Sequence, residues 1–286
     1  MRSILRSLFR TAMHMYPRER GKYSLLMRLY FPYFAPRTAT KVTSTLKFGM
    51  RMHLDLTEYL QSHLYVFGDY ELPTIRFIRQ RLQANAVCID VGAQMGYLTL
   101  AMATAAGRAT TVHSFEPEDV NAKRFLENMT LNNLSNVHLH RCAVSNVDGT
   151  LRLYLSKDMN AGTHSTVYNP DNVSTDFIEI PSTTLDSFST THGLQRMDLV
   201  KIDVEGAEFD VLRGAETVLR TLRPCVILEL SDALQKAHGT TCRQIKQHMA
   251  DRGYSAFTIA DDGTPVPSAL DALHMNDNVV FLPLQD

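Results

Sequence analysis

From residue 86 onward, short unbroken apolar runs alternate with segments of helical periodicity. The apolar runs predict strands at 86–91, 111–115, 137–144, 199–202, 225–230, 254–259 and 278–282. The helical pattern predicts helices over 97–106, 118–132, 207–222 and 241–252. Parallel strands covered by helices on both faces read as continuous apolar runs, because neither face meets water. The pattern therefore predicts an α/β fold, a doubly wound, mostly parallel sheet with helices on both faces.

The N-terminal region has a different pattern. Residues 1–16 predict an amphipathic helix, and three arginines follow each other at i+4 spacing on one face, namely Arg2, Arg6 and Arg10. The apolar face carries Ile4, Leu5, Leu8, Phe9 and Ala12. Such a helix can lie on a membrane surface, or its apolar face can pack onto the body or a second subunit, and the two interpretations are equally supported. Arginines inside the apolar stretch disfavour a secretory signal, and a transit peptide stays open.

Three segments are predicted in the domain organisation. Residues 1–41 form a basic, amphipathic helical arm, interrupted by Pro17, Pro32 and Pro36. Residues 42–85 hold a β-hairpin, alternating over 42–56 around Gly49, and helices at 58–67 and 72–83. Residues 86–286 form the catalytic domain, with an insertion at about 149–189 that is rich in Ser, Thr and Asn. Strand-like runs at 151–155 and 177–180 make this insertion antiparallel.

Charge is unevenly distributed along the 286 residues. The whole chain has a net charge of −1, yet residues 1–85 contain 14 Lys/Arg against 5 Asp/Glu. A basic head on an acidic body suggests a surface role for the head, with a membrane or another polyanion. No apolar run reaches the roughly 18 residues of a spanning helix. We therefore expect a cytoplasmic protein with peripheral membrane contact through residues 1–16; the oligomeric state stays open.

Acidic residues stand at the C-terminal ends of four predicted strands: Asp90, Glu116, Asp203 and Glu229. Ligands of doubly wound sheets bind outside these strand ends. Desolvating a charge there is costly unless it is paired. Four acids at one rim therefore predict a site for a cationic or hydroxyl-rich ligand.

The turn after the first of these strands reads Asp90-Val91-Gly92-Ala93-Gln94-Met95-Gly96. A dinucleotide-binding G-x-G-x-x-G turn needs glycines where this chain has Gln94 and Tyr97, so the pyrophosphate cradle is missing. Glu116 follows 20 residues after Gly96, where an acid can accept both ribose hydroxyls. These features suit a nucleoside ligand without phosphate, and S-adenosylmethionine, with two cationic groups and a free ribose, is the expected cofactor.

Several segments carry a resemblance to a known family. They are IDVGAQMGYLTLA at 89–101, FEP at 115–117, AVSNVDGTLRLY at 143–154, TTLDSF at 183–188 and KIDVEGAEFDVLRGA at 201–215. In their order and spacing, residues from about 42 to 284 resemble the FkbM-type S-adenosylmethionine-dependent methyltransferases. The resemblance implies a class I methyltransferase (Rossmann-like) fold and O-methylation of a hydroxyl on a saccharide, glycolipid or polyketide-like molecule. The chain departs from the family at Gln94, where members usually have Asn.

The resemblance also implies roles for individual residues. Asp90, Gly92, Ala93, Gln94 and Gly96 are expected to border the methionine part of the cofactor. Glu116 and Pro117 are expected at the ribose and adenine, Ala143 and Val144 at the other face of the adenine, and Asp203 near the ammonium or the acceptor. For the general base that a hydroxyl needs, the candidates are Glu205, then Asp203, with His164 as a weaker one.

Alternatives remain beside this interpretation. A nicotinamide-dependent oxidoreductase is disfavoured by Gln94, and a nucleic-acid methyltransferase by the acidic body and by Asp203-Val204-Glu205-Gly206 in place of an N/D-P-P-aromatic turn. A non-catalytic cofactor-binding or scaffolding module stays open. Asp203, Glu205 and Glu229 could hold a divalent cation, but a metal-free site is favoured. The expected partner is a small-molecule, glycan or lipid-linked hydroxyl acceptor, not a nucleic acid.

Overall fold

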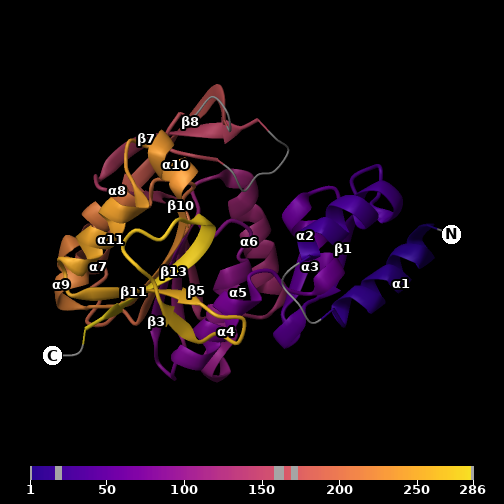
Figure 1. The fold of residues 1–286 in the computed structure, drawn as a ribbon, viewed down its shortest axis with the longest axis horizontal. Coiled ribbons are helices and arrows are strands. Elements are labelled where there is room, and N and C mark those ends of the chain that lie inside the picture. The colour runs from indigo at the N-terminus through magenta and orange to yellow at the C-terminus, as the bar shows by residue number, and fades with distance from the viewer. Residues whose placement is uncertain (1, 17–20, 158–163, 169–172, 285–286) are drawn as a thin grey trace. The chain divides into compact units, whose positions relative to one another are not determined.

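The computed structural model describes residues 2–16, 21–157, 164–168 and 173–284 (Figure 1). The chain divides into two compact units. The first comprises Met1–Leu72 with Thr130–Asn133, and the second comprises Pro73–Met129 with Leu134–Asp286. The predicted candidate site residues all fall in the second unit, and the predicted amphipathic helix falls in the first.

An eight-stranded sheet forms the centre of the second unit, in the order β12-β11-β13-β10-β9-β3-β4-β5. Its strands are β3 (Val87–Val91), β4 (Thr111–Phe115), β5 (Val137–His140), β9 (Leu199–Ile202), β10 (Cys225–Ser231), β11 (Tyr254–Ile259), β12 (Pro265–Pro267) and β13 (Met275–Pro283). The five strands from β10 to β5 pair in parallel, and β13 lies antiparallel between β10 and β11. The sheet is thus mostly parallel, so the predicted α/β fold class is confirmed.

One predicted strand is wrong in extent. The run 137–144 is divided in the structure, because β5 ends at His140 and the next two-residue strand, β6 (Ala143–Val144), pairs with another sheet. That second sheet has the order β6-β8-β7, with β7 (Gly149–Ser156) and β8 (Val173–Thr183) antiparallel. The strands predicted within the insertion are therefore present, and both are longer than expected.

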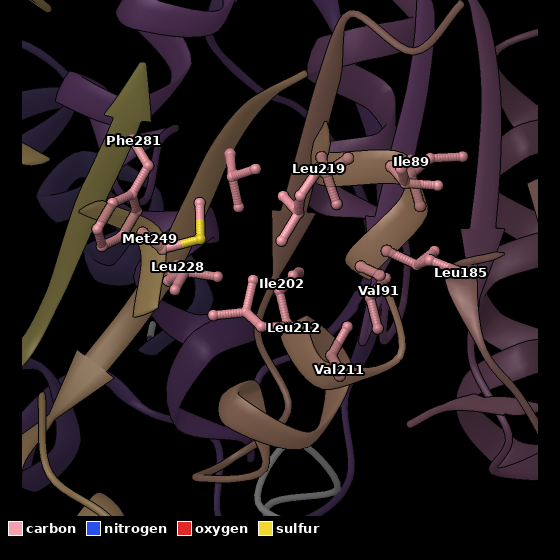
Figure 2. Packing of buried hydrophobic residues seen from close by; sticks show 14 of the residues in the cluster. Ile89, Val91, Leu185, Ile202, Val211, Leu212, Leu219, Leu228, Met249 and Phe281 are labelled. Carbon is pink, nitrogen blue, oxygen red and sulfur yellow. The ribbon is translucent and has the colours of Figure 1, made fainter. Parts of the chain in front are cut away.

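Helices cover both faces of the large sheet. On one face, α7 (Leu185–Thr191), α8 (Glu208–Arg213), α9 (Glu216–Thr221) and α11 (Cys242–Ala250) contribute to a buried apolar cluster. Figure 2 shows Val211, Leu212 and Met249 of these helices packed beside strand residues such as Ile202 and Leu228. On the other face, α4 (Leu72–Arg81) and α5 (Tyr97–Thr104) pack over a second cluster. Burial of these side chains is the main stabilisation of the sheet.

The helix predicted over 207–222 is two helices, α8 and α9, separated at Gly214. A Cβ at this position would lie 2.0 Å from the carbonyl oxygen of Ser145. The backbone of the second sheet therefore approaches the helix too closely for a side chain, which a local periodicity cannot reveal. Two further helices complete the unit, α6 (Asp119–Leu131) and the unpredicted α10 (Asp232–Ala237).

The first unit combines a hairpin with helices. Strands β1 (Lys41–Thr45) and β2 (Arg51–Asp55) pair antiparallel as expected, with α3 (Tyr59–Phe67) after them. A π-helix, η1 (Leu26–Phe34), follows the short α2 (Lys22–Leu25) and contains Pro32, so the predicted break at this proline is wrong. Lys22 and Lys47 both bind the fully buried carboxylate of Asp69, which pairs that charge inside the unit.

Helix α1 (Arg2–His14) forms as predicted. Its arginines, however, face the rest of the unit, and several of its apolar side chains face solvent. Arg6 Nε donates to the carbonyl of Phe34 at 3.0 Å, and Arg10 Nε donates to the carbonyl of Tyr65 at 3.0 Å. Both arginines thus bind the body of the unit, whereas Ile4, Leu5 and Leu8 are exposed. Within the part of the chain that the structure describes, no helix combines the length and apolarity needed to cross a bilayer.

Candidate functional site

The turn between β3 and α5 packs directly against the end of β9. Gly92 has a φ of +81°, and a Cβ there would lie 1.8 Å from the carbonyl oxygen of Asp203. The backbone amides of Gly92 and Ala93 both donate to the carbonyl of Phe115, at 3.1 and 3.0 Å. Glycine is therefore required at this point for close approach as well as for backbone conformation.

Gln94 continues this turn in the left-handed region, with a φ of +49°. Its backbone amide donates to Glu116 Oε2 at 2.9 Å, and the amide of Glu118 donates to Glu116 Oε1 at 2.9 Å. The amide that would face a phosphate in a dinucleotide-binding turn is thus bonded to a carboxylate. Burial raises the pKa of Glu116 to about 7, against the opposing effect of these two amides.

Asp90 lies behind the turn. Its side chain is buried and accepts a hydrogen bond from Thr99 Oγ1, which also contacts Ser114 Oγ at 2.9 Å. Burial raises the pKa of Asp90 to about 6. The Asp90 carboxyl therefore links β3 to α5 through a buried hydrogen bond.

At the end of β9, Asp203 belongs to a group of interacting charges. The buried Lys201 donates from Nζ to Asp203 Oδ2 at 3.2 Å, and Glu229 contributes a further hydrogen bond. Burial opposes ionisation of Asp203, but Lys201 and the hydrogen bonds outweigh it and hold the pKa below the usual range. Asp203 is thus an ionised carboxylate with 26% of its side chain exposed.

Glu205 follows in a strained turn, with a φ of +53° that non-glycine residues rarely adopt. Glu208 Oε1 holds this turn by accepting from the amides of Val204 and Gly206, both at 3.1 Å. Ser165 Oγ donates to the Glu205 carbonyl at 3.2 Å. Burial, then the charges of Asp203 and Glu208, raise the pKa of the Glu205 carboxyl to about 8.

His164 has a defined tautomer. Its Nδ1 accepts a hydrogen bond from the backbone amide of Ser156 at 2.9 Å, so the proton of the neutral ring is on Nε2. Burial lowers its pKa, which keeps the ring neutral. His164 can therefore donate a hydrogen bond from Nε2, but it has no free nitrogen with which to accept a proton. Residues 160–163, which precede His164 in the chain, lie outside the described residues.

A cleft opens at the ends of these strands. Eight of the predicted site residues line it: Gly92, Gln94, Glu116, Pro117, Ala143, Val144, His164 and Asp203. Four predicted residues do not belong to its lining. Asp90, Ala93 and Gly96 lie in or beneath the first turn, and Glu205 lies in the turn after β9. The structure thus brings the glycine turn, the acid after β4 and the acid after β9 to one cavity.

Sequence patterns did not single out other lining residues. Phe115, Cys142, Leu153, Thr166 and Val204 also line the cleft, and most of them adjoin a predicted site residue in the chain. Leu153 comes from β7 of the insertion, and the alternation of apolar residues along this strand is the only sequence signal that could have identified it. Among the residues that the structure describes, no three His, Cys, Asp or Glu side chains are placed to hold a metal ion.

The donors and acceptors of this cleft suit a nucleoside rather than a nucleotide. Glu116 presents a carboxylate whose free lone pairs can accept from ribose hydroxyls, and Asp203 presents negative charge for a cation. The turn amide nearest to them already donates to Glu116. Ala143, Val144 and Leu153 provide an apolar surface for a base. The residues therefore fit S-adenosylmethionine, which has no phosphate.

Comparison with known proteins agrees with this chemistry. The family described as "Methyltransferase FkbM domain" matches residues 90–256, which is more than half of the chain. Methyltransferase 1 of Beauveria bassiana is 31% identical over 167 residues, covering 52% of this chain and 66% of that protein. The antimetabolite synthetase AmbE of Pseudomonas aeruginosa is 26% identical over 213 residues, covering 63% of this chain and 10% of that protein.

Among solved structures, the methyltransferase FkbM of Methylobacillus flagellatus shares 15% identity with a TM-score of 0.47. The match covers 78% of this chain and 54% of that one. The chain therefore spans less than two thirds of the length of each of these three relatives. The family match agrees with the motifs in the turns after β3 and β9, and it supports S-adenosylmethionine as the cofactor.

Proposed function

Since the chain belongs to the FkbM methyltransferase family, we propose that it methylates a hydroxyl group of a saccharide, glycolipid or polyketide-like acceptor with S-adenosylmethionine. The observation that carries the proposal is the bonding of Glu116. Its two oxygens are held by the amides of Gln94 and Glu118, so the turn is built around a ribose acceptor and not around a phosphate. Bound S-adenosylmethionine would supply a methyl group activated by its sulfonium charge.

The residues of the cleft divide the binding task. Glu116 accepts the ribose hydroxyls, and Pro117, Ala143 and Val144 contact the base. Asp203 is ionised at neutral pH and attracts the cationic end of the cofactor, while Lys201 and Glu229 hold the Asp203 carboxylate in place. Since methyl transfer is an in-line displacement, the chain must chiefly align the acceptor oxygen behind the methyl group.

We assign deprotonation of the acceptor to Glu205, which does not line the cleft but lies two residues after the cleft residue Asp203. A hydroxyl is a weak nucleophile until a base within hydrogen-bond reach removes its proton. His164 is unsuited because its Nδ1 is bonded and its Nε2 carries a proton. Asp203 is stabilised as an anion, which makes it a weaker base than Glu205, whose pKa of about 8 lies close to the working range. A cation bound beside Glu205 favours its ionised form.

Cofactor binding provides the first test. In isothermal titration calorimetry, S-adenosylmethionine should bind the wild-type chain and NAD should not. Glu116→Gln should weaken binding by roughly tenfold or more, because the ribose hydroxyls lose a charged acceptor. Glu127→Gln is the matched control, because Glu127 is an exposed acid of α6 that does not line the cleft. Equal binding of NAD, or an undiminished affinity of Glu116→Gln, would reject the cofactor assignment.

Turnover provides the second test, with labelled S-adenosylmethionine, host extract and mass spectrometry of the methylated product. Glu205→Gln should retain cofactor affinity and lose roughly 10²–10⁴-fold in turnover, as expected for a general base. Asp203→Asn should weaken cofactor binding as well. Native turnover in Glu205→Gln would contradict the base assignment, and labelling of a nitrogen or carbon atom would contradict O-methylation. Cofactor binding with no product from any extract would favour the non-catalytic module.

A further inference from the structure

Among the side chains of α1 that the structure describes, those of residues 4–14, none on the exposed face is charged. The helix half-buries Arg6, Phe9, Arg10, Met13 and His14 against its own unit. Phe9 stacks on Phe34 with ring centroids 4.6 Å apart. The opposite face consists of Ile4, Leu5, Ser7, Leu8, Thr11 and Ala12, with Met15 directly after the helix, and all are exposed. An amphipathic helix normally buries its apolar face, so we expect a binding partner or a membrane to cover the exposed face of α1.

The arginines are fixed in this orientation by several bonds. Besides its bond to Tyr65, Arg10 donates from Nη2 to Ser44 Oγ at 2.8 Å and lies over the Tyr65 ring at 5.0 Å. Arg6 is bonded to the Phe34 carbonyl. Turning the helix to bury its leucines would break these contacts and leave carbonyl groups of the unit without donors. The outward apolar face is therefore a stable feature of this unit.

The exposed side chains are large. Ile4 is 65% exposed, Leu8 is 63% exposed and Met15 is 81% exposed, and they follow one another along the same side of the helix. Exposed apolar side chains along one side of a helix are typical of a helix lying in the boundary between lipid headgroups and acyl chains.

We propose that this face of α1, defined by Ile4, Leu5, Leu8 and Met15, docks the protein on an anionic lipid bilayer. Size argues against a second copy of the chain as the occupant. A helix of 13 residues offers a strip roughly 20 Å long and about 10 Å wide, whereas a stable protein interface buries about 800 Å² per partner.

Charge argues for an anionic surface. Residues 1–72 contain 11 Lys/Arg against 5 Asp/Glu. Because Arg6 and Arg10 are bonded internally, the attraction comes from other basic residues, of which Arg28, Arg37 and Lys41 are exposed. The apolar face supplies insertion, and the net positive charge of residues 1–72 supplies preference for anionic headgroups.

Vesicle co-sedimentation of the full chain tests the proposal. The wild-type chain should bind vesicles of phosphatidylcholine with phosphatidylserine more tightly than phosphatidylcholine alone. The double substitution Ile4→Glu with Leu8→Glu should lower the partition coefficient roughly tenfold or more. Leu273→Glu is the matched control, because Leu273 is 83% exposed in the second unit, and it should bind like wild type. Equal losses in both variants would overturn the proposal.

Fluorescence gives a readout that does not depend on charge substitutions. The chain contains no tryptophan, so Leu8→Trp creates a single probe. Its emission should shift to the blue when anionic vesicles are added, and that of Leu273→Trp should not. Absence of a shift in Leu8→Trp would overturn the proposal. So would a lipid-free dimer that Leu8→Glu dissociates, since the occupant would then be a second copy.

Discussion

The two turns at the cleft, after β3 and after β9, are alike in backbone and opposite in chemistry. Each carries a non-glycine residue in the left-handed region, Gln94 in the first and Glu205 in the second. In the first turn the backbone amide of Gln94 donates to a carboxylate on the neighbouring strand. In the second turn the residue brings its own carboxyl, and another acid, Glu208, accepts the turn amides.

This difference suits the two turns to different tasks, ligand binding and proton transfer. The first turn positions a carboxylate, Glu116, by donating to it, which favours the charged form. In the second turn, burial and then the charges of Asp203 and Glu208 favour the neutral form of the Glu205 carboxyl. Backbone strain at a residue with a shifted pKa is typical of functional sites. The first turn is thus suited to recognition, and the second to proton transfer.

The largest effect on stability is expected when a glycine of each turn is replaced by alanine. Gly92→Ala should lower the free energy of unfolding by about 3 kcal/mol or more, because its Cβ meets the Asp203 backbone, which cannot move freely. Gly206→Ala should cost about 2 kcal/mol, because its Cβ meets the His238 side chain, 2.7 Å away. Denaturant unfolding measures both.

Gly239→Ala is the control for these two substitutions. Gly239 has a φ of +71°, and a Cβ added there would meet nothing within 4 Å, so only backbone strain of about 1 kcal/mol is expected. If Gly92→Ala were no more costly than Gly239→Ala, the close approach of the two strand ends would be disproved.

Smaller effects on cofactor affinity, turnover and stability are expected from a change of pH. Because burial raises both pKa values, to about 7 for Glu116 and about 8 for Glu205, cofactor affinity should rise with pH through about 7 and turnover through about 8. Stability should change in the opposite direction. The folded state binds these protons more tightly than the unfolded state, so their contribution is present at acidic pH and is lost as pH rises.

Glu205→Gln separates these two trends, because it cannot ionise. Its melting temperature should exceed that of the wild type at about pH 9 and approach it at about pH 5. Turnover of the wild type that does not change with pH between about 6 and 9, at saturating cofactor, would exclude a base with this pKa.

The smallest effect is expected from Gln94→Asn. Asparagine tolerates the left-handed region better than glutamine, so unfolding should become more costly by about 0.5 kcal/mol. Cofactor affinity should change by no more than about twofold, since the bond to Glu116 comes from the backbone amide. Calorimetry and thermal unfolding check both values. A large loss of affinity would show that the longer side chain of Gln94 contacts the ligand.

The apolar pattern predicted the sheet well, because a strand buried on both faces leaves a mark in the residues themselves. The bounds of β4, β9 and β11 are those expected from their apolar runs. The strand ends then place Glu116 and Asp203 at the cleft, since parallel strands end at one edge. The glycine turn is equally local, because a missing Cβ and an adjacent acid are visible in the chain.

Tertiary structure alone decided the rest. The run 137–144 is predicted as one strand, yet it divides because Ala143 and Val144 pair with β8, a partner distant in sequence. The orientation of α1 depends on carbonyl groups of Phe34 and Tyr65, and the tautomer of His164 depends on the amide of Ser156. Each is set by a hydrogen bond between segments that periodicity treats separately. A residue pattern determines which faces are apolar, but only the folded backbone determines which polar groups need a partner.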